Sequence, residues 1–141
     1  MIGLKNFKFD DQTKRVADAA EKATFRNVRH AAAAIRRDAI ESIQQADGPS
    51  APGSPPHTHT GGITKKGNTR KGNLQRAIAY DTDKDSAVIG PRESVVGLAG
   101  QAHEMGESFH GTDYDERPFM GPALDKNLDR FASSWQGSIG G

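Results

Sequence analysis

The pattern of apolar and polar positions in the first third of the chain predicts one long helix over residues 11–46. Apolar and small residues recur there at spacings of three and four, and neither glycine nor proline interrupts them. Asp10 or Asp11 suits the N-cap, and Asp47-Gly48-Pro49 supplies a stop. Such a helix would be about 54 Å long, longer than a globule of this size needs, so we expect it to project or to pack against other subunits. The stripe consists of Phe25, Val28, Ala32, Ile35, Ala39, Ser42 and Ala46.

Two short runs in the middle of the chain predict a β-hairpin over residues 74–90. Leu74–Tyr80 alternates with the period of a half-buried strand, and Ala87–Ile89 forms a second strand that ends at Gly90-Pro91. The polar residues 81–85 supply the turn. A hairpin is not stable alone in water, so we expect the long helix to cover its apolar face.

The last third predicts a short helix over residues 94–106 and an extended segment with a C-terminal helix over residues 116–135. Gly97 and Gly100 each weaken the short helix by about 1 kcal/mol relative to alanine, so part of it is expected to be irregular. Pro118 favours an edge strand at Arg117–Met120, and Pro122 suits the first position of the last helix. The stripe of that helix is Leu124, Leu128, Phe131 and Trp135.

Residues 48–73 are rich in proline, glycine and basic side chains. Four of the seven prolines lie in its first nine residues, which favours extended backbone over helix. Loops of this length are usually functional or disordered. We expect a basic arm that orders against a partner during assembly; a flexible loop without a partner is the alternative.

These elements together predict a single α+β domain over residues 1–141, in which the long helix packs on a small antiparallel sheet. Leu, Ile, Val and Phe make up only 24 of the 141 residues, so a monomer would be marginal and neighbouring subunits are expected to complete its apolar surface. The chain has no cysteine and no apolar run of about 20 residues. We expect a soluble protein without a signal peptide, made and used inside a cell.

The net charge of +1 conceals an uneven distribution. Residues 1–47 carry a net charge of +2, residues 48–80 of +5 and residues 81–141 of −6. Opposite charges at two ends of a chain suit head-to-tail contacts between copies, although charge runs are often only solvated surface.

The sequence contains only weak candidates for a metal-binding or catalytic site. His57-Thr58-His59, His103, Glu104 and His110 suggest a metal, but their spacing matches no established ligand pattern, and His103-Glu104 lacks the second histidine of a zincin helix. No nucleophile elbow or phosphate loop is present, and the acidic Asp113, Asp115 and Glu116 suit solvated surface. We predict no enzyme, no cofactor and no metal.

The order of several short motifs resembles the tail-completion family of tailed bacteriophages, which includes neck, minor tail and head–tail joining proteins. The motifs are His103-Glu104-Met105-Gly106, Arg117-Pro118-Phe119-Met120, Pro122-Ala123-Leu124, Pro52-Gly53-Ser54-Pro55-Pro56 and residues 72–78. Met105 stands where the family commonly has Phe, and the loop between residues 106 and 117 is long.

The resemblance implies a structural virion protein that forms a ring of six or twelve copies, completes the tail and joins it to the head connector. It implies contacts with other neck, connector, tail-terminator or tail-tube proteins, passing contact with DNA in the channel, no membrane, and assembly in the host cytoplasm. The interface residues expected on this basis are Pro52, Pro55, Pro56, Lys65, Lys66, Arg70, Lys71, Glu104, Arg117, Phe119 and Met120.

Two further hypotheses remain open. The chain could instead be a nucleic-acid-binding module that uses the basic arm and a helix face with Lys22, Arg26, Arg29, Arg36 and Arg37, although it lacks the interleaved aromatic residues of stacking proteins. A metal-dependent hydrolase is a third and weaker reading. Separately, Glu104 and Arg117 flank the long loop, and we expect them to pair within or between subunits.

Overall fold

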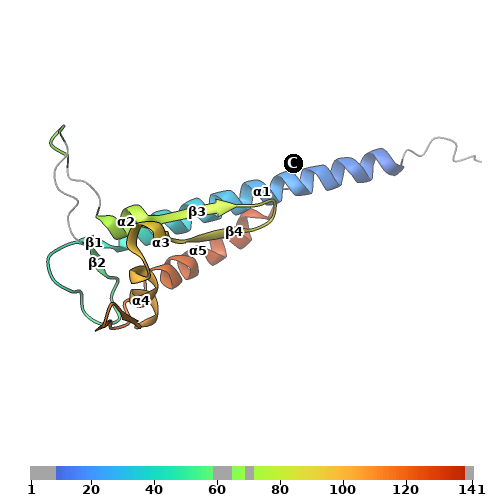
Figure 1. The fold of residues 1–141 in the computed structure, drawn as a ribbon. Helices are drawn as coiled ribbons and strands as arrows, with labels where there is room; N and C mark the ends of the chain where they lie inside the picture. The colour runs from blue at the N-terminus through green and yellow to red at the C-terminus, as the bar shows by residue number, and fades with distance from the viewer. Residues whose placement is uncertain (1–8, 59–64, 69–71, 139–141) are drawn as a thin grey trace, which may run out of the picture.

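The computed structural model describes residues 9–58, 65–68 and 72–138 and has the α+β class expected from the sequence. Its spine is the helix α1 (Phe9–Ser42). The antiparallel hairpin of β3 (Ile78–Thr82) and β4 (Ala87–Pro91) lies along one side of α1, and the helix α5 (Met120–Ser134) lies along another (Figure 1). Among the described residues, no helix is long and apolar enough to cross a membrane.

The hydrophobic core lies beside the C-terminal half of α1. There the helix meets the start of the hairpin and the first turn of α5, and these contacts exclude water from the buried side chains. The N-terminal turns of α1 run beyond both partners (Figure 1), and residues 13–19 are all exposed. The molecule is therefore a packed body with a projecting helix. The core consists of Ile35, Ala39, Ile40, Ile43, Leu74, Ile78, Phe119 and Ala123.

The β3–β4 hairpin has the predicted antiparallel pairing, with Ile78 opposite Pro91 and Thr82 opposite Ala87. Two further strand pairs were not predicted. β1 (Gln44–Gln45) pairs in parallel with β2 (His57–Thr58), and β5 (Ser108–Phe109) pairs with β6 (Thr112–Asp113). These strands have two residues each, too short to leave a periodic signal in the sequence.

The predicted end of the first helix at residue 46 is four residues too late. The Nε2 amide of Gln75 donates hydrogen bonds to the carbonyl oxygens of Ile40 (3.3 Å) and Ile43 (2.8 Å), which satisfies acceptors that a further turn would have used. The chain then becomes extended as β1 and pairs with β2.

The sequence predicted that Leu74–Ala77 is part of a strand, and this prediction is wrong. These residues belong to the short helix α2 (Asn73–Ala77). The buried side chains Leu74, Ala77 and Ile78 also fit the i, i+3, i+4 spacing of a helix, and so short a run does not distinguish the two periods.

The helix predicted over residues 94–106 is two helices, α3 (Glu93–Val96) and α4 (Ala99–Met105). Gly97 separates them with a φ of +58°, which other residues rarely adopt.

Arg117–Met120 is not an edge strand either, and α5 begins at Met120, so that Pro122 occupies its third position rather than its first. The carboxylate of Glu104 causes this earlier start, as described below.

The first part of the proline-rich segment packs against the body instead of forming a free arm. Ser50 and Pro56 are buried, the amide of Gly53 donates to the carbonyl of Glu116 (2.8 Å), and β2 pairs with β1. The rest of the predicted arm lies outside the described residues, except for residues 65–68 and 72–73.

Candidate assembly interface

The side chain of Glu104, on α4, holds the N-terminus of α5. Its Oε2 atom accepts hydrogen bonds from the backbone amides of Phe119 (2.8 Å) and Met120 (2.9 Å), and its Oε1 atom accepts one from Gly121 (2.8 Å). Pro122 has no N–H, so one carboxylate accepts every amide hydrogen from residue 119 to residue 122. A negative charge at this place also interacts favourably with the helix dipole.

Arg117 is buried and holds the loop before α5 against the proline-rich segment. Its Nε atom donates to the carbonyl of Ser50 (2.9 Å), and its guanidinium forms an ion pair with Asp115 (3.1 Å). The hypothesis that Glu104 and Arg117 pair is wrong within the chain, because each side chain has other partners. Together they nevertheless fix both ends of the connection between α4 and α5.

His103 lies beside this joint and packs edge-on against Tyr114, with ring centroids 4.7 Å apart. Burial, and to a lesser degree the positive charge of Arg117, lower the pKa of His103 below its usual 6.5. Its Nδ1 atom is buried and has no hydrogen-bond partner. The uncharged ring is thus the form that this position favours.

Gln75 is a structural residue that the sequence reasoning missed. Besides capping α1, its Oε1 atom accepts hydrogen bonds from Gln45 Nε2 (3.1 Å) and from the amide of Gly72 (3.3 Å). A glutamine three residues after the start of a helix is a known capping signal, and this was the available clue. The same buried amide therefore ends α1 and begins α2.

A polar contact sets the position of α5 on α1. Asn127 Nδ2 donates to Asp38 Oδ2 (2.8 Å) and to the carbonyl of Ala123 (2.8 Å), and all three residues are buried. The Asn127 hydrogen bond, with smaller contributions from Lys126 and Arg37, lowers the pKa of Asp38 below 3.8 although burial opposes the shift. The aspartate is thus held in its charged form between the two helices.

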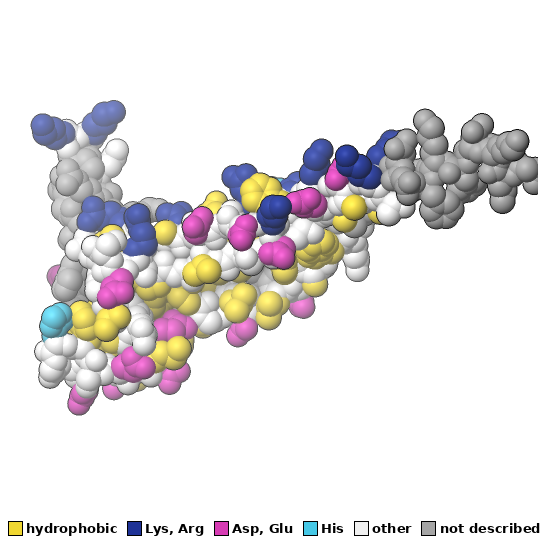
Figure 2. All heavy atoms as spheres, turned by 45° about the vertical axis from the view of Figure 1, so that its right-hand side comes forward, with side chains coloured by type: hydrophobic (Ala, Val, Ile, Leu, Met, Phe, Trp, Pro, Cys, Tyr) yellow, Lys and Arg dark blue, Asp and Glu magenta, His cyan; other side chains and the backbone are white. Residues whose placement is uncertain are grey.

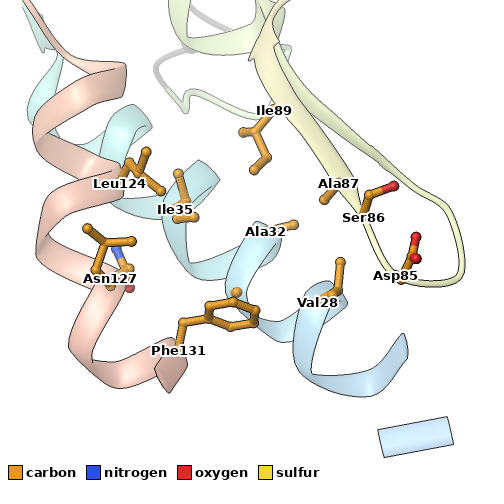
Figure 3. A pocket seen from close by; sticks show the side chains of 12 residues that line it. Val28, Ala32, Ile35, Asp85, Ser86, Ala87, Ile89, Leu124, Asn127 and Phe131 are labelled. Carbon is orange, nitrogen blue, oxygen red and sulfur yellow. The ribbon is translucent and has the colours of Figure 1, made fainter. Parts of the chain in front are cut away.

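An open apolar groove of about 340 Å³ runs between the hairpin and α5, with α1 as its floor. Figure 3 shows Val28, Ala32 and Ile35 on the floor, Ala87 and Ile89 on the hairpin side, and Leu124 and Phe131 on α5. Leu124 and Leu128 remain 46% and 48% exposed. The stripe predicted for the last helix is therefore only partly covered: Ala123 and Asn127 face α1, and the two leucines line the groove.

A second hollow, of about 290 Å³, lies beside α3 and α4. Leu98 and Met105 line it and are exposed. The described part of the chain thus leaves apolar surface uncovered at these two hollows and at other places, such as Val16, Phe25 and Val88, which fits the small number of large apolar residues in the sequence.

The residues predicted for an interface do not form one surface. Phe119 (1% exposed), Pro56 and Arg117 are buried within the chain, whereas Glu104, Met120 and Pro55 are partly buried. The exposed ones are Pro52, Lys65 and Lys66, and Arg70 and Lys71 lie outside the described residues. That these residues contact a neighbouring subunit stays a prediction.

The residues that suggested a metal are not gathered into a site. Among the described residues, no group of three or more His, Asp or Glu side chains is placed to hold a metal ion. His57 Nδ1 lies 3.1 Å from the carbonyl of Gly48, and His59 is outside the described ranges.

The basic side chains predicted along the long helix are mostly exposed. Lys22, Arg26, Arg29 and Arg37 are on the surface, while Arg36 Nε donates to the carbonyl of Ile78 (2.8 Å). In Figure 2 basic side chains gather along the upper edge of the visible face, and acidic ones lie lower, among hydrophobic ones. On the face that Figure 2 shows, basic and acidic side chains are thus unevenly distributed.

Comparisons of the chain with protein-family models, curated proteins and solved structures found no match.

Proposed function

We propose that this protein is a structural subunit of a ring at the neck or tail top of a tailed bacteriophage, where it completes the tail and joins it to the head connector. The observation that carries the proposal is the apolar groove between the hairpin and α5, which lies open next to a helix that projects from the body. Exposed apolar surface of this kind marks an interaction site.

The motifs behind the phage resemblance support this assignment by their position. Glu104, Arg117 and Phe119 build the joint that holds α5 beside α1, and α5 supplies one wall of the groove. These residues therefore act by shaping a binding surface instead of by touching a partner directly. Such a role needs no catalytic group.

The surface charges support contacts between unlike faces. Residues 81–141 carry a net charge of −6, and residues 48–80 carry +5. Opposite potentials on two faces of one subunit favour head-to-tail contacts, which form a ring when their rotation closes.

Assembly can be tested with the purified protein by light scattering and electron microscopy over a range of concentrations. We expect closed rings of six or twelve copies. Leu128→Asp, which places a charge in the groove, should abolish them, whereas Val88→Asp should not, because Val88 is 79% exposed and does not line the groove. A protein that stays monomeric at about 1 mM would overturn the proposal, because this concentration is at or above the Kd of even weak specific complexes.

A second candidate function is nucleic-acid binding, favoured by the exposed Lys22, Arg26 and Arg29 on α1 and by Lys65 and Lys66. Binding through phosphates makes the affinity fall with salt, with a logarithmic slope of about −0.9 per contact on duplex DNA. The double variant Arg26→Ala/Arg29→Ala should then reduce the slope by about 2. No measurable DNA affinity at low salt would exclude this function.

A further inference from the structure

A smaller cavity, of about 190 Å³, lies on the other side of the contact between α1 and α5 from the apolar groove. Ala31, Asn127 and Phe131 line both the groove and this cavity, because they lie at the contact of the two helices. Unlike the groove, the cavity has several polar side chains in its wall, and we call it the polar cavity. They are Asn27 and His30 from α1 and Arg130 and Ser134 from α5.

The buried amide of Asn27 has an unused hydrogen-bond donor. Its side chain is 4% exposed, and its Nδ2 atom has no hydrogen-bond partner among the described residues. Asn127, by contrast, donates to two acceptors, the carboxylate of Asp38 and the carbonyl of Ala123. A buried donor without an acceptor costs stability, and native proteins contain few of them. A half-turn of the Asn27 amide exchanges its nitrogen and oxygen within the same volume, so the amide can donate to an acceptor in the cavity.

Arg130 gives the polar cavity a positive charge. It is the only Lys, Arg, Asp or Glu among the described residues that line the cavity, and none of the ion pairs between described residues involves it. Asn127 links the cavity to Asp38, whose charge is balanced by Lys126 (3.8 Å) and Arg37 (3.4 Å). The exposed charged residues beside Asn27, His30 and Arg130 in sequence do not line the cavity; they are Arg26, Arg29 and Asp129. The wall therefore favours a ligand with one negative charge.

The donors in the wall fit the oxygens of a carboxylate. The guanidinium of Arg130 can donate two parallel hydrogen bonds to one carboxylate, and Asn27 and His30 offer further N–H groups. A single arginine balances the charge of a carboxylate, whereas a phosphate group carries a charge of about −1.5 to −2 at neutral pH. A carboxylate is thus the better match for this wall.

The rest of the wall fits an apolar stem behind that carboxylate. Ala31, Ala34 and Phe131 supply apolar surface, which favours methylene groups over further polar atoms. The hydroxyl of Ser134 donates to the carbonyl of Phe131 (2.6 Å) and is therefore not an additional donor for the ligand.

We propose that the polar cavity between α1 and α5 binds a carboxylate carried on a short apolar stem. Asn27 and Arg130 donate to the carboxylate oxygens, and Phe131 contacts the stem. The same chemistry is found in a free organic acid and in an acidic side chain of another protein. The inference goes beyond the proposed function, because the cavity lies within one subunit and does not depend on a ring.

Trp135 provides a signal for a binding experiment. It is the only tryptophan of the chain, and its ring lies edge-on to that of Phe131, with the ring centroids 6.3 Å apart. Butyrate and acetyl-glutamate amide carry similar carboxylate stems, free in the first and attached to a peptide backbone in the second. Each is titrated into the full chain at constant ionic strength, so that salt screening does not change, and binding is followed by fluorescence and calorimetry.

We expect saturable binding of a carboxylate probe, and binding at least about tenfold weaker for the uncharged butyramide and acetyl-glutamine amide. Tighter binding of butyrate would indicate a free acid as the ligand. Binding of acetyl-glutamate amide that is at least as tight would indicate an acidic side chain. No saturation by either probe up to about 50 mM, where even a site of millimolar affinity is filled, would overturn the inference. Tighter binding of inorganic phosphate than of both probes would also overturn it.

Two variants locate the binding in the polar cavity. Asn27→Leu and Arg130→Gln should each weaken binding of the carboxylate probe by at least about tenfold. Arg92→Gln is the matched control, because Arg92 is exposed and does not line the cavity, and it should change the affinity by less than about twofold. Unchanged binding in Asn27→Leu, or an equal loss in Arg92→Gln and Arg130→Gln, would contradict the assignment.

The stability of Asn27→Leu separates a role in binding from a role in folding. Leucine has a similar size and no polar atom, so replacing an unused buried donor should leave Tm unchanged or raise it. Lost binding with retained Tm is therefore the expected result. A lower Tm with unchanged binding would assign Asn27 to folding and refute the proposal. Arg130 is exposed, so Arg130→Gln tests the site even where Asn27→Leu does not fold.

Discussion

The Glu104 cap makes the sharpest prediction for stability, because one side chain accepts three backbone hydrogen bonds. In Glu104→Ala the amides of Phe119, Met120 and Gly121 lose their acceptor, and α5 loses the negative charge at its N-terminus. Loss of an ordinary N-cap costs about 0.5–2 kcal/mol. Loss of a favourable charge near the helix dipole adds about 0.3–1 kcal/mol.

The structure places the cost of Glu104→Ala above that of an ordinary cap. Three donors are affected instead of one, and Phe119 is almost completely buried, so water replaces the lost acceptor only in part. We expect the free energy of unfolding to fall by about 2–4 kcal/mol. Natural domains are stable by only about 5–15 kcal/mol, so this is a large fraction for a chain with few large apolar residues.

Glu104→Gln is the closer comparison, because it preserves the shape. The remaining oxygen can accept from Phe119 and Met120, but the new amide group then faces the N–H of Gly121. We expect a loss of about 1–2 kcal/mol, between the alanine variant and the unchanged protein. Both values can be measured by urea denaturation followed by far-UV circular dichroism.

Glu107→Gln serves as the control for a neighbouring charge. Glu107 is exposed and its carboxylate accepts only a surface hydrogen bond from Gln101 (3.2 Å), so its loss should cost less than about 0.5 kcal/mol. Hydrogen exchange of the amides of Met120 and Gly121 should become faster in the Glu104 variants alone. A Glu104→Ala protein as stable as Glu107→Gln, with unchanged exchange at these amides, would refute the reasoning.

Three further predictions concern the buried polar contacts and one close approach. The pKa of Asp38 is lowered in the folded state, so its charged form contributes stability above pH 3.8 that is lost as the pH falls through the folded pKa. The midpoint of urea denaturation should therefore decrease as the pH is lowered from about 5 to about 2. In Asn127→Ala this dependence on pH should be weaker, because the hydrogen bond that lowers the pKa most is removed. Gln75→Leu leaves the carbonyls of Ile40 and Ile43 without their donor and should cost about 2–4 kcal/mol, seen as a fall in Tm of roughly 10 °C. Gln45→Leu removes the hydrogen bond from Gln45 Nε2 to Gln75 Oε1 but leaves both carbonyls with their donor, so it should cost less than half as much. Gly100→Ala should lower the free energy of unfolding by about 1–3 kcal/mol despite the better helix propensity of alanine, because its Cβ would overlap the ring of Pro91. Gly90→Ala is the control and should cause no such loss, because no atom lies near the position of its Cβ. Equal denaturation midpoints for the two variants would contradict this prediction.

The helices with a long, regular pattern were predictable from the sequence. α1 and α5 show the 3.6-residue period over many turns, and their predicted ranges differ from the observed ones mainly at the ends. The ends were missed because distant side chains decide them. Gln75 ends α1 from 32 residues away in sequence, and Glu104 starts α5 from 15 residues away. No local pattern contains such a partner.

The groove could not be predicted for a related reason. The spacing of Leu124, Leu128, Phe131 and Trp135 indicates an apolar stripe but not how much of it another element covers. Coverage depends on the rotation of α5, which the contact between Asn127 and Asp38 helps to set. An asparagine within a helix gives no sign of this in a single sequence. The chemistry of the stripe was therefore predictable, and its exposure was not.

The two halves of α1 differ in a way that links folding to assembly under the proposed function. The C-terminal half is held by contacts within the chain, which are the hydrophobic core and the hydrogen bonds from Gln75. The turns before Glu21 project from the packed body, with residues 13–19 all exposed, and helices in proteins gain most of their stability from packing. If a neighbouring subunit of the ring covers the groove, that contact buries Leu124 and Leu128. Subunit concentration would then control the exposure of the groove, because mass action stabilises whatever form binds. Under the proposed function, a small hydrophobic core is compatible with a stable ring, because the apolar contacts missing from each subunit would be made between subunits.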